Sequence, residues 1–81
     1  MLTNLLNRIT INTEIMQGKP VIKGTRLTVE YILNLLAQGE SLDAILEEYE
    51  SLTAQDIYAC LFFAAQSLKT VSFMPLSQQA A

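Results

Sequence analysis

The sequence predicts a mainly α-helical domain in which three helices, the last two with helix-turn-helix character, follow a short N-terminal β segment. Apolar residues alternate with polar ones only near the N-terminus, which indicates an extended strand. From residue 28 onward they recur with the 3.6-residue period of helices. A length of 81 residues allows one domain, which we expect to span residues 1–68 ahead of a C-terminal tail at 69–81.

The β segment is predicted from residues 8–12, Arg-Ile-Thr-Ile-Asn, which alternate in polarity and contain β-branched side chains. A loop is expected over residues 13–20, because this stretch contains a glycine and a proline. Residues 20–22 predict a second extended piece. Gly24 then predicts a turn, at a backbone angle that other residues disfavour.

Two of the three helices are predicted between residues 28 and 50, each by a capping residue and an apolar face. Thr28 is the expected N-cap of the first helix, and Gly39 is expected to end it. Ser41 is the expected N-cap of the second helix. The apolar faces are expected to consist of Val29, Ile32, Leu33 and Leu36 in the first helix and of Leu42, Ile45, Leu46 and Tyr49 in the second.

The third helix has the clearest start signal in the chain. Thr53 and Asp56 have the spacing of a capping box, with Asp in place of the usual Glu or Gln. We expect this helix to run to about Leu68. Its expected core face consists of Ile57, Leu61, Ala64 and Leu68, with Cys60 and Ala65 beside it.

Phe62 and Phe63 are predicted to lie on the opposite face of the third helix, with Ala59 and Gln66 between them. Large apolar side chains on an outward face usually mark a contact. Three interpretations stay open. The two rings pack beneath the N-terminal strand or the tail, they form an interface with a second copy or a partner, or they are exposed without a role.

Composition limits the ways in which so small a domain is stabilised. The chain is 51% hydrophobic, but a single Cys excludes an internal disulfide, and without His a structural zinc is not expected. For a chain of this size, the gain from apolar burial and the cost of ordering nearly cancel. We therefore expect a homodimer or a bound partner to supply further burial. The sequence has no apolar run of about 18 residues and no signal-peptide pattern, so we expect a cytoplasmic protein.

Catalytic chemistry is not predicted, and we expect neither a cofactor nor a metal. Without His, no Ser-His or Cys-His dyad can be built in this chain. Cys60 is interpreted as a buried apolar residue rather than a nucleophile. Glu47, Glu48 and Glu50 are interpreted as a solvated helix face rather than a cation site. Residues 18–25 contain the glycines and lysine of a phosphate loop in the wrong order, which excludes that motif.

Charge is distributed unevenly along the chain. Residues 1–26 carry four cations and one anion, a net +3, whereas residues 27–81 carry one cation and seven anions, a net −6. Such asymmetry is typical of a nucleic-acid surface on the basic side, although scattered surface cations give the same count. The acidic third helix would repel phosphates. The candidate nucleic-acid-binding residues are therefore Arg8, Lys19, Lys23 and Arg26.

Three stretches of sequence, at residues 8–12, 18–26 and 52–57, resemble the family catalogued as domain of unknown function 433. The similarity covers about residues 8–65, and the block Gly-Lys-Pro-Val-Ile-Lys-Gly-Thr-Arg is its most specific part. The resemblance implies a homeodomain-like helix-turn-helix domain, that is, a three-helix bundle with an N-terminal β segment. It also implies a bacterial, antitoxin-like protein that forms a dimer, pairs with a PIN-like ribonuclease toxin and in some cases binds its own operator DNA.

Two functional hypotheses follow. The first is an antitoxin-like interaction protein without enzymatic activity, which buries apolar surface against a toxin or a second copy. The second is a stand-alone DNA-binding transcriptional regulator that uses the basic N-terminal block, and its binding should weaken steeply with salt. The candidate interface residues are Phe62 and Phe63, from their expected outward position, and Phe73, Met74 and Leu76, by analogy with antitoxin tails.

Overall fold

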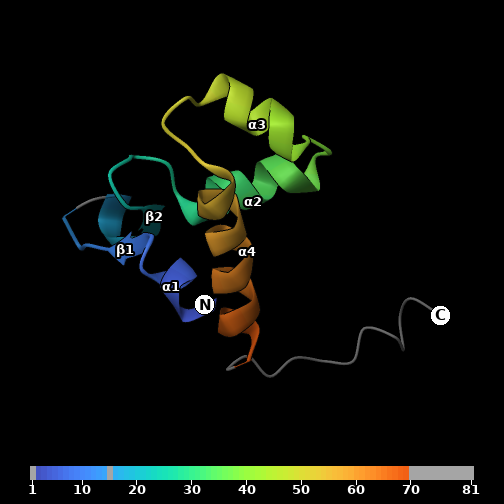
Figure 1. Cartoon of the computed structure of the whole chain (residues 1–81). Coiled ribbons are helices and arrows are strands. Elements are labelled where there is room, and N and C mark those ends of the chain that lie inside the picture. Colours follow the sequence, from blue (N-terminus) through green and yellow to red (C-terminus); the bar gives the residue numbers. More distant parts are fainter. Residues whose placement is uncertain (1, 15, 70–81) are drawn as a thin grey trace.

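A computed structural model describes residues 2–14 and 16–69 of the chain. This part of the protein is mainly helical, with four α-helices, a short 3-10 helix and a two-stranded antiparallel sheet (Figure 1). Over the same residues, no helix combines the length and the apolar composition that crossing a bilayer requires. The elements, in chain order, are α1 (Leu2–Leu6), β1 (Ile9–Ile11), η1 (Met16–Gly18), β2 (Pro20–Ile22), α2 (Val29–Ala37), α3 (Leu42–Glu48) and α4 (Ala54–Leu68).

The mainly helical class and the N-terminal β segment are confirmed, but the described residues form four α-helices rather than the three predicted. This additional helix is α1, whose five residues give too little periodicity for a prediction. It packs against α4 (Figure 1). At its end the N–H of Arg8 donates to the carbonyl of Leu5 at 3.0 Å, and the chain then enters β1 directly. Helix α1 thus covers a side of α4 that would be open in a three-helix arrangement.

The β segment is a small antiparallel pair in which Thr10 of β1 lies opposite Val21 of β2. Beyond the end of β2, the N–H of Lys23 donates to the carbonyl of Arg8 at 2.7 Å and extends the pairing. The predicted turn at Gly24 is confirmed, and its φ of +82° lies in the left-handed region that favours glycine. Because β2 is buried at its second and third residues, the sheet forms one wall of the core.

The predicted start signals of α2 and α3 and the predicted end signal of α2 are confirmed. The side-chain oxygens of Thr28 and Ser41 each accept a hydrogen bond from the N–H three residues ahead, at 3.0 and 3.1 Å. Gly39, with a φ of +97°, ends α2. Its N–H and that of the following residue return to the carbonyls of Leu36 and Leu35, both at 3.0 Å. This pair of bonds is a Schellman motif, which satisfies carbonyls that the helix end leaves without partners.

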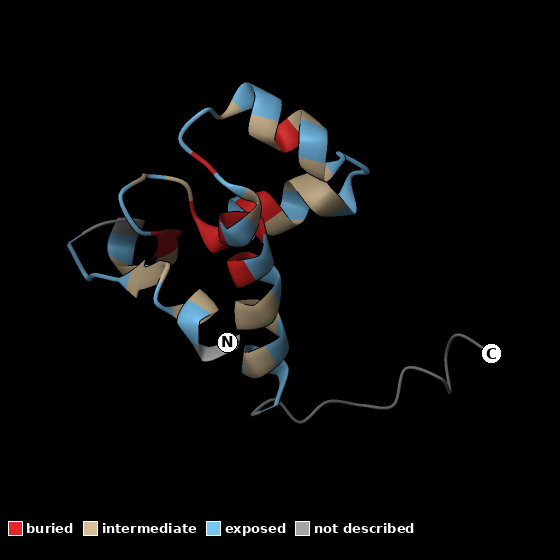
Figure 2. Cartoon of the chain, in the orientation of Figure 1, coloured by how far each residue is buried: buried red, intermediate tan, exposed pale blue. Residues whose placement is uncertain are grey.

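The core lies where α2, α3, α4 and β2 meet, and Figure 2 shows the buried residues gathered there. Leu52, in the short connection between α3 and α4, is buried among them and fixes the entry into α4. Cys60 is fully buried, as predicted. The core residues are Ile22, Val29, Ile32, Ile45, Leu52, Ile57 and Cys60.

The predicted core face of α4 is partly wrong. Ile57 is buried as expected, but the exposed fractions of Leu61 and Leu68 are 46% and 58%. Ala59, which was expected on the outward face between the two phenylalanines, is fully buried. The reason is that α4 contacts α1 and β1 as well as α2 and α3, so its buried surface is wider than one stripe and rotated from the predicted one.

Candidate functional site

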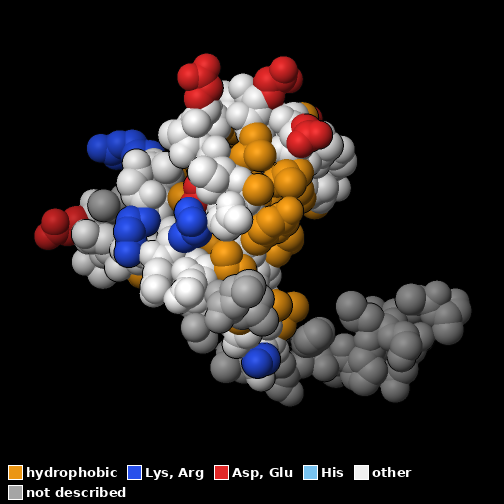
Figure 3. Space-filling model, in the orientation of Figure 1, with side chains coloured by type: hydrophobic (Ala, Val, Ile, Leu, Met, Phe, Trp, Pro, Cys, Tyr) orange, Lys and Arg blue, Asp and Glu red, His pale blue; other side chains and the backbone are white. Residues whose placement is uncertain are grey.

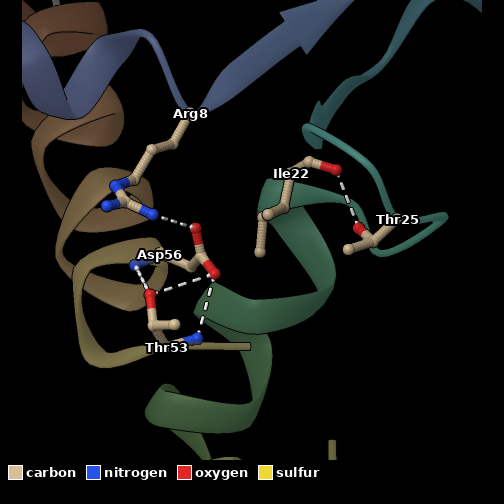
Figure 4. A network of polar contacts seen from close by, with 5 residues as sticks. All are labelled: Arg8, Ile22, Thr25, Thr53 and Asp56. Atoms are coloured by element: carbon tan, nitrogen blue, oxygen red, sulfur yellow. Dashed lines mark hydrogen bonds and ion pairs between the residues drawn. The ribbon is translucent and has the colours of Figure 1, made fainter. Parts of the chain in front are cut away.

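One polar network joins the N-terminal β segment to the first turn of α4 (Figure 4). Arg8 donates from Nη1 to Oδ1 of Asp56 at 3.1 Å. The other carboxylate oxygen, Oδ2, accepts from the N–H and the Oγ1 of Thr53 at 2.9 and 3.2 Å. In return, the N–H of Asp56 donates to Oγ1 of Thr53 at 3.4 Å. The predicted capping box is therefore confirmed, and sequence reasoning missed Arg8 as its third member.

Two of the four predicted nucleic-acid-binding cations are held in ion pairs. Besides the pair between Arg8 and Asp56, the Nζ of Lys19 lies 3.4 Å from Oε1 of Glu30 at the start of α2. The Lys19 pair is exposed on both sides, so it is readily exchanged for other partners. Arg8 is half-exposed, whereas the Asp56 side chain is only 10% exposed. The Arg8 pair is therefore less screened by water than the Lys19 pair and contributes more to the stability of the fold.

The other two predicted cations, Lys23 and Arg26, are exposed in the turn between β2 and α2 and form no ion pair with any other described residue. This turn is closed by the side chain of Thr25. Its Oγ1 donates to the carbonyl of Ile22 at 2.8 Å (Figure 4). The same oxygen accepts from the N–H of Leu27 at 3.0 Å. The two cations therefore project from one fixed turn.

The acidic face of the molecule lies on and around α3. Figure 3 shows acidic side chains at the α3 end of the molecule, both basic and acidic side chains toward the N-terminal segment, and a further basic side chain near the end of α4. Within the part of the chain that the structure describes, no cluster of three or more His, Cys, Asp or Glu has the arrangement of a metal site. The acidic face consists of five exposed residues on and around α3, which are Glu40, Asp43, Glu47, Glu48 and Glu50.

An open apolar groove of about 450 Å³ runs between α2 and α4, with one residue of β2 at its edge. Leu33 packs against the core as predicted and also lines this groove, whereas Leu68, which was predicted on a core face, is exposed along it. A signal for it existed in the sequence, because apolar residues in α2 and α4 occupy more of the helix circumference than one packing stripe needs. The residues that line the α2–α4 groove are Pro20, Val29, Glu30, Leu33, Asn34, Phe63, Ala64, Ser67 and Leu68.

The five predicted interface residues fall into two groups. Phe62 and Phe63 are both half-buried, so the prediction that they straddle an outward face of α4 is wrong. Phe63 packs against the core and lines the α2–α4 groove. The other three, Phe73, Met74 and Leu76, lie outside the described residues.

Two side chains have perturbed acidities, for different reasons. Burial, with a smaller contribution from the charge of Asp56, raises the pKa of the Cys60 thiol to about 12, so this thiol is protonated at neutral pH. The Tyr49 hydroxyl shares a hydrogen bond with that of Tyr31, which is the main reason that its pKa rises to about 12. The two tyrosine rings meet edge to face, with centroids 6.1 Å apart, and join α2 to the end of α3. Neither arrangement provides an activated nucleophile.

Comparison with known proteins gives three matches. A sequence model of the family described as "Protein of unknown function (DUF433)" matches residues 9–64. An uncharacterized protein y4eO of Sinorhizobium fredii (strain NBRC 101917 / NGR234) is 34% identical over 56 residues, which are 69% of this chain and 25% of that protein. The chain thus spans about a quarter of the length of this curated relative. The crystal structure of a DUF433 member protein from Anabaena variabilis ATCC 29413 is 28% identical and superposes with a TM-score of 0.74, covering 84% of this chain and 67% of that one.

Proposed function

The chain belongs to the DUF433 family, and from this premise we propose that it is an antitoxin-like interaction protein without enzymatic activity of its own. On this proposal it acts in the cytoplasm as a homodimer. Its α3–α4 pair serves as a homeodomain-like helix-turn-helix, and it neutralises a PIN-like ribonuclease toxin. Operator DNA is a second ligand of the resulting complex.

The observation that carries the proposal is the open α2–α4 groove. The groove offers contiguous apolar surface, and a partner that covers it removes that surface from water. Apolar residues from two helices and β2 line this groove, and its rim carries few charges. Such an apolar centre with a polar rim is the anatomy of a protein–protein interface.

The acidic face supports a partner of the proposed chemistry. A ribonuclease must attract RNA phosphates, so its substrate-binding surface is positively charged. The acidic face consists of five exposed carboxylates, and no Lys or Arg occurs in the sequence between Leu27 and Leu68. A negative face of this kind steers a basic protein into the encounter and suppresses wrong partners.

The test is co-expression with the product of the adjacent gene, followed by purification through a tag on that product. We expect the two proteins to co-purify and the chain to relieve the growth arrest that the partner causes. The variant Glu47→Lys should slow association and flatten its salt dependence. Glu14→Lys, an exposed change of the same charge away from α3, is the matched control. A neighbouring product that neither binds nor arrests growth would contradict the proposal.

The homodimer is tested separately, by sedimentation of the purified chain over a range of concentrations. For a chain of this size, the free energy gained by burying apolar surface is about equal to the entropic cost of ordering the chain. A second copy stabilises the fold because it buries further apolar surface. We expect a dimer at micromolar concentration. A folded monomer that stays monomeric throughout that range would remove this part of the proposal.

A specific observation favours a second candidate function, that of a stand-alone DNA-binding regulator. Lys23 and Arg26 are exposed in one fixed turn and free of ion pairs with described residues. In a mobility-shift assay with upstream DNA, Lys23→Ala or Arg26→Ala should each weaken binding uniformly and lower the salt slope by about 1. Lys69→Ala, which removes an exposed cation at the C-terminal end of α4, is the control of equal charge. Absence of a shift at low salt would exclude this candidate.

A further inference from the structure

We propose that the occupant of the α2–α4 groove in the free protein is the chain's own C-terminal segment, residues 70–81. The groove lies against the last turns of α4, where Ala64, Ser67 and Leu68 form one wall. The described chain leaves this helix at Lys69, one residue beyond the groove wall. The segment therefore starts at the mouth of the groove, whatever path it follows afterwards.

The composition of the segment matches the surface that it would cover. Residues 70–81 contain no charged side chain, and Phe73, Met74 and Leu76 form an apolar cluster within four positions. Burying these groups beside an apolar wall gains free energy, and no ion has to lose its hydration. Pro75 favours an extended backbone at Met74, so the cluster suits a strip along a groove better than a continuation of α4.

The reach of the segment is sufficient. The four steps from Lys69 to Phe73 span at most about 14 Å when extended. The helical rise from Phe63 to Lys69 is about 9 Å, at roughly 1.5 Å per residue. One reversal of direction takes up part of this span, so Phe73 can lie beside the last α4 residues of the groove wall, and Leu76, three residues further on, beside the first.

Attachment favours the chain's own segment over other occupants. A segment joined directly to the groove wall has an effective concentration in the millimolar range, above that of any free partner or second copy at ordinary protein concentrations. A partner that uses this groove must first displace the segment. The inference concerns the free protein and stands whether or not the partner is a toxin.

The experiment uses the complete absence of Trp from the chain, which makes a single introduced Trp a unique fluorescent reporter. We would compare the full-length variants Phe73→Trp, within the apolar cluster, and Gln79→Trp, beyond it. The Phe73→Trp reporter should emit at shorter wavelength and be less accessible to acrylamide than the Gln79→Trp reporter. Equal accessibility at the two positions would overturn the proposal.

A matched pair of substitutions on α4 tests the groove itself. Leu68 lines the groove and Leu61 does not, while both are largely exposed. In the Phe73→Trp background, Leu68→Ser should raise the ratio of released to docked segment about tenfold. Leu61→Ser should leave it unchanged, with circular dichroism confirming the helical content of both variants. An equal effect of the two changes would overturn the assignment to this groove.

Dilution distinguishes the chain's own segment from that of a second copy. An intramolecular contact is independent of concentration, so the shielding of the Phe73→Trp reporter should persist over about a hundredfold dilution. Shielding that is lost on dilution would assign the groove to a second copy and overturn the proposal. The fluorescence readout needs no partner and no DNA. A negative result would therefore contradict docking of the segment only, and the proposed function would still be tested by co-purification.

Discussion

Arg8 and Asp56 lie 48 positions apart in the chain, yet their side chains meet at 3.1 Å where the β segment adjoins the first turn of α4. Asp56 thereby serves both as the third residue of a capping box and as the acceptor for a cation from another element. Its two oxygens accept from one donor of Arg8 and two of Thr53. This carboxylate couples the position of the N-terminal segment to the start of the central helix.

The first prediction concerns the long-range half of that network. Arg8→Met keeps much of the side-chain volume but removes the donor. We expect the free energy of unfolding to fall by about 1–2 kcal/mol, because Asp56 is largely buried while Arg8 is half-exposed. Lys19→Met, which breaks an exposed pair with Glu30, should cost less than about 0.5 kcal/mol. Urea unfolding of both variants gives the comparison. Equal losses would show that the Arg8 pair is an ordinary surface contact.

The second prediction concerns the local half. Thr53→Ala removes the oxygen that caps α4 and should destabilise the protein by about 1 kcal/mol, which lowers the Tm by about 4–8 °C. Thr53→Ser keeps the hydroxyl and should retain most of the stability. Thermal unfolding by circular dichroism measures both. If the serine variant loses as much as the alanine variant, the hydroxyl is not the stabilising group.

The features predictable from the sequence are those that depend on near neighbours. Thr28, Ser41 and Thr53 each bond within three residues of themselves, and Gly39 ends a helix by its own backbone angle. Propensity and spacing contain all the information that such features need. The two short strands were predictable for the same reason, since the antiparallel partner follows after one loop.

The features that were not predictable depend on packing between distant elements. Five residues at the N-terminus have too little pattern to indicate α1, and it is α1 and β1 that widen the buried surface of α4. Spacing alone therefore placed Leu61 in the core and Ala59 outside it, and the structure reverses both. The α2–α4 groove escaped prediction because an apolar face in the sequence looks the same whether it is packed or open. The pairing of Arg8 with Asp56 has no local signal at all.

The third prediction tests this reversal on α4. Ala59 is fully buried, so Ala59→Leu should overpack the contact region and cost about 1–3 kcal/mol. Leu61→Ala removes a larger side chain, but its free energy of unfolding should stay within about 0.5 kcal/mol of the wild-type value. The reason is that nearly half of the Leu61 side chain is already in water. Urea unfolding ranks the two variants. The opposite order would restore the single-stripe arrangement that the sequence alone predicts.

The fourth prediction concerns pH and Cys60. Burial raises the pKa of this thiol from its ordinary value of 9.0 to about 12. Below pH 9 the thiol is protonated in both the folded and the unfolded chain. Between 9 and about 12 the unfolded chain loses the proton while the folded chain keeps it, so the free energy of unfolding should fall as pH rises through this window.

A comparison with Cys60→Ala isolates the contribution of the thiol, because every other side chain is the same in the two proteins. The stability advantage of the wild type over Cys60→Ala should shrink as the pH rises from about 9 toward 12. In native buffer at neutral pH, iodoacetamide should modify Cys60 only after unfolding, since the folded thiol is both covered and protonated. A pH-independent difference between the two proteins, or rapid alkylation of the folded chain, would place the thiol in contact with water and contradict its position in the core.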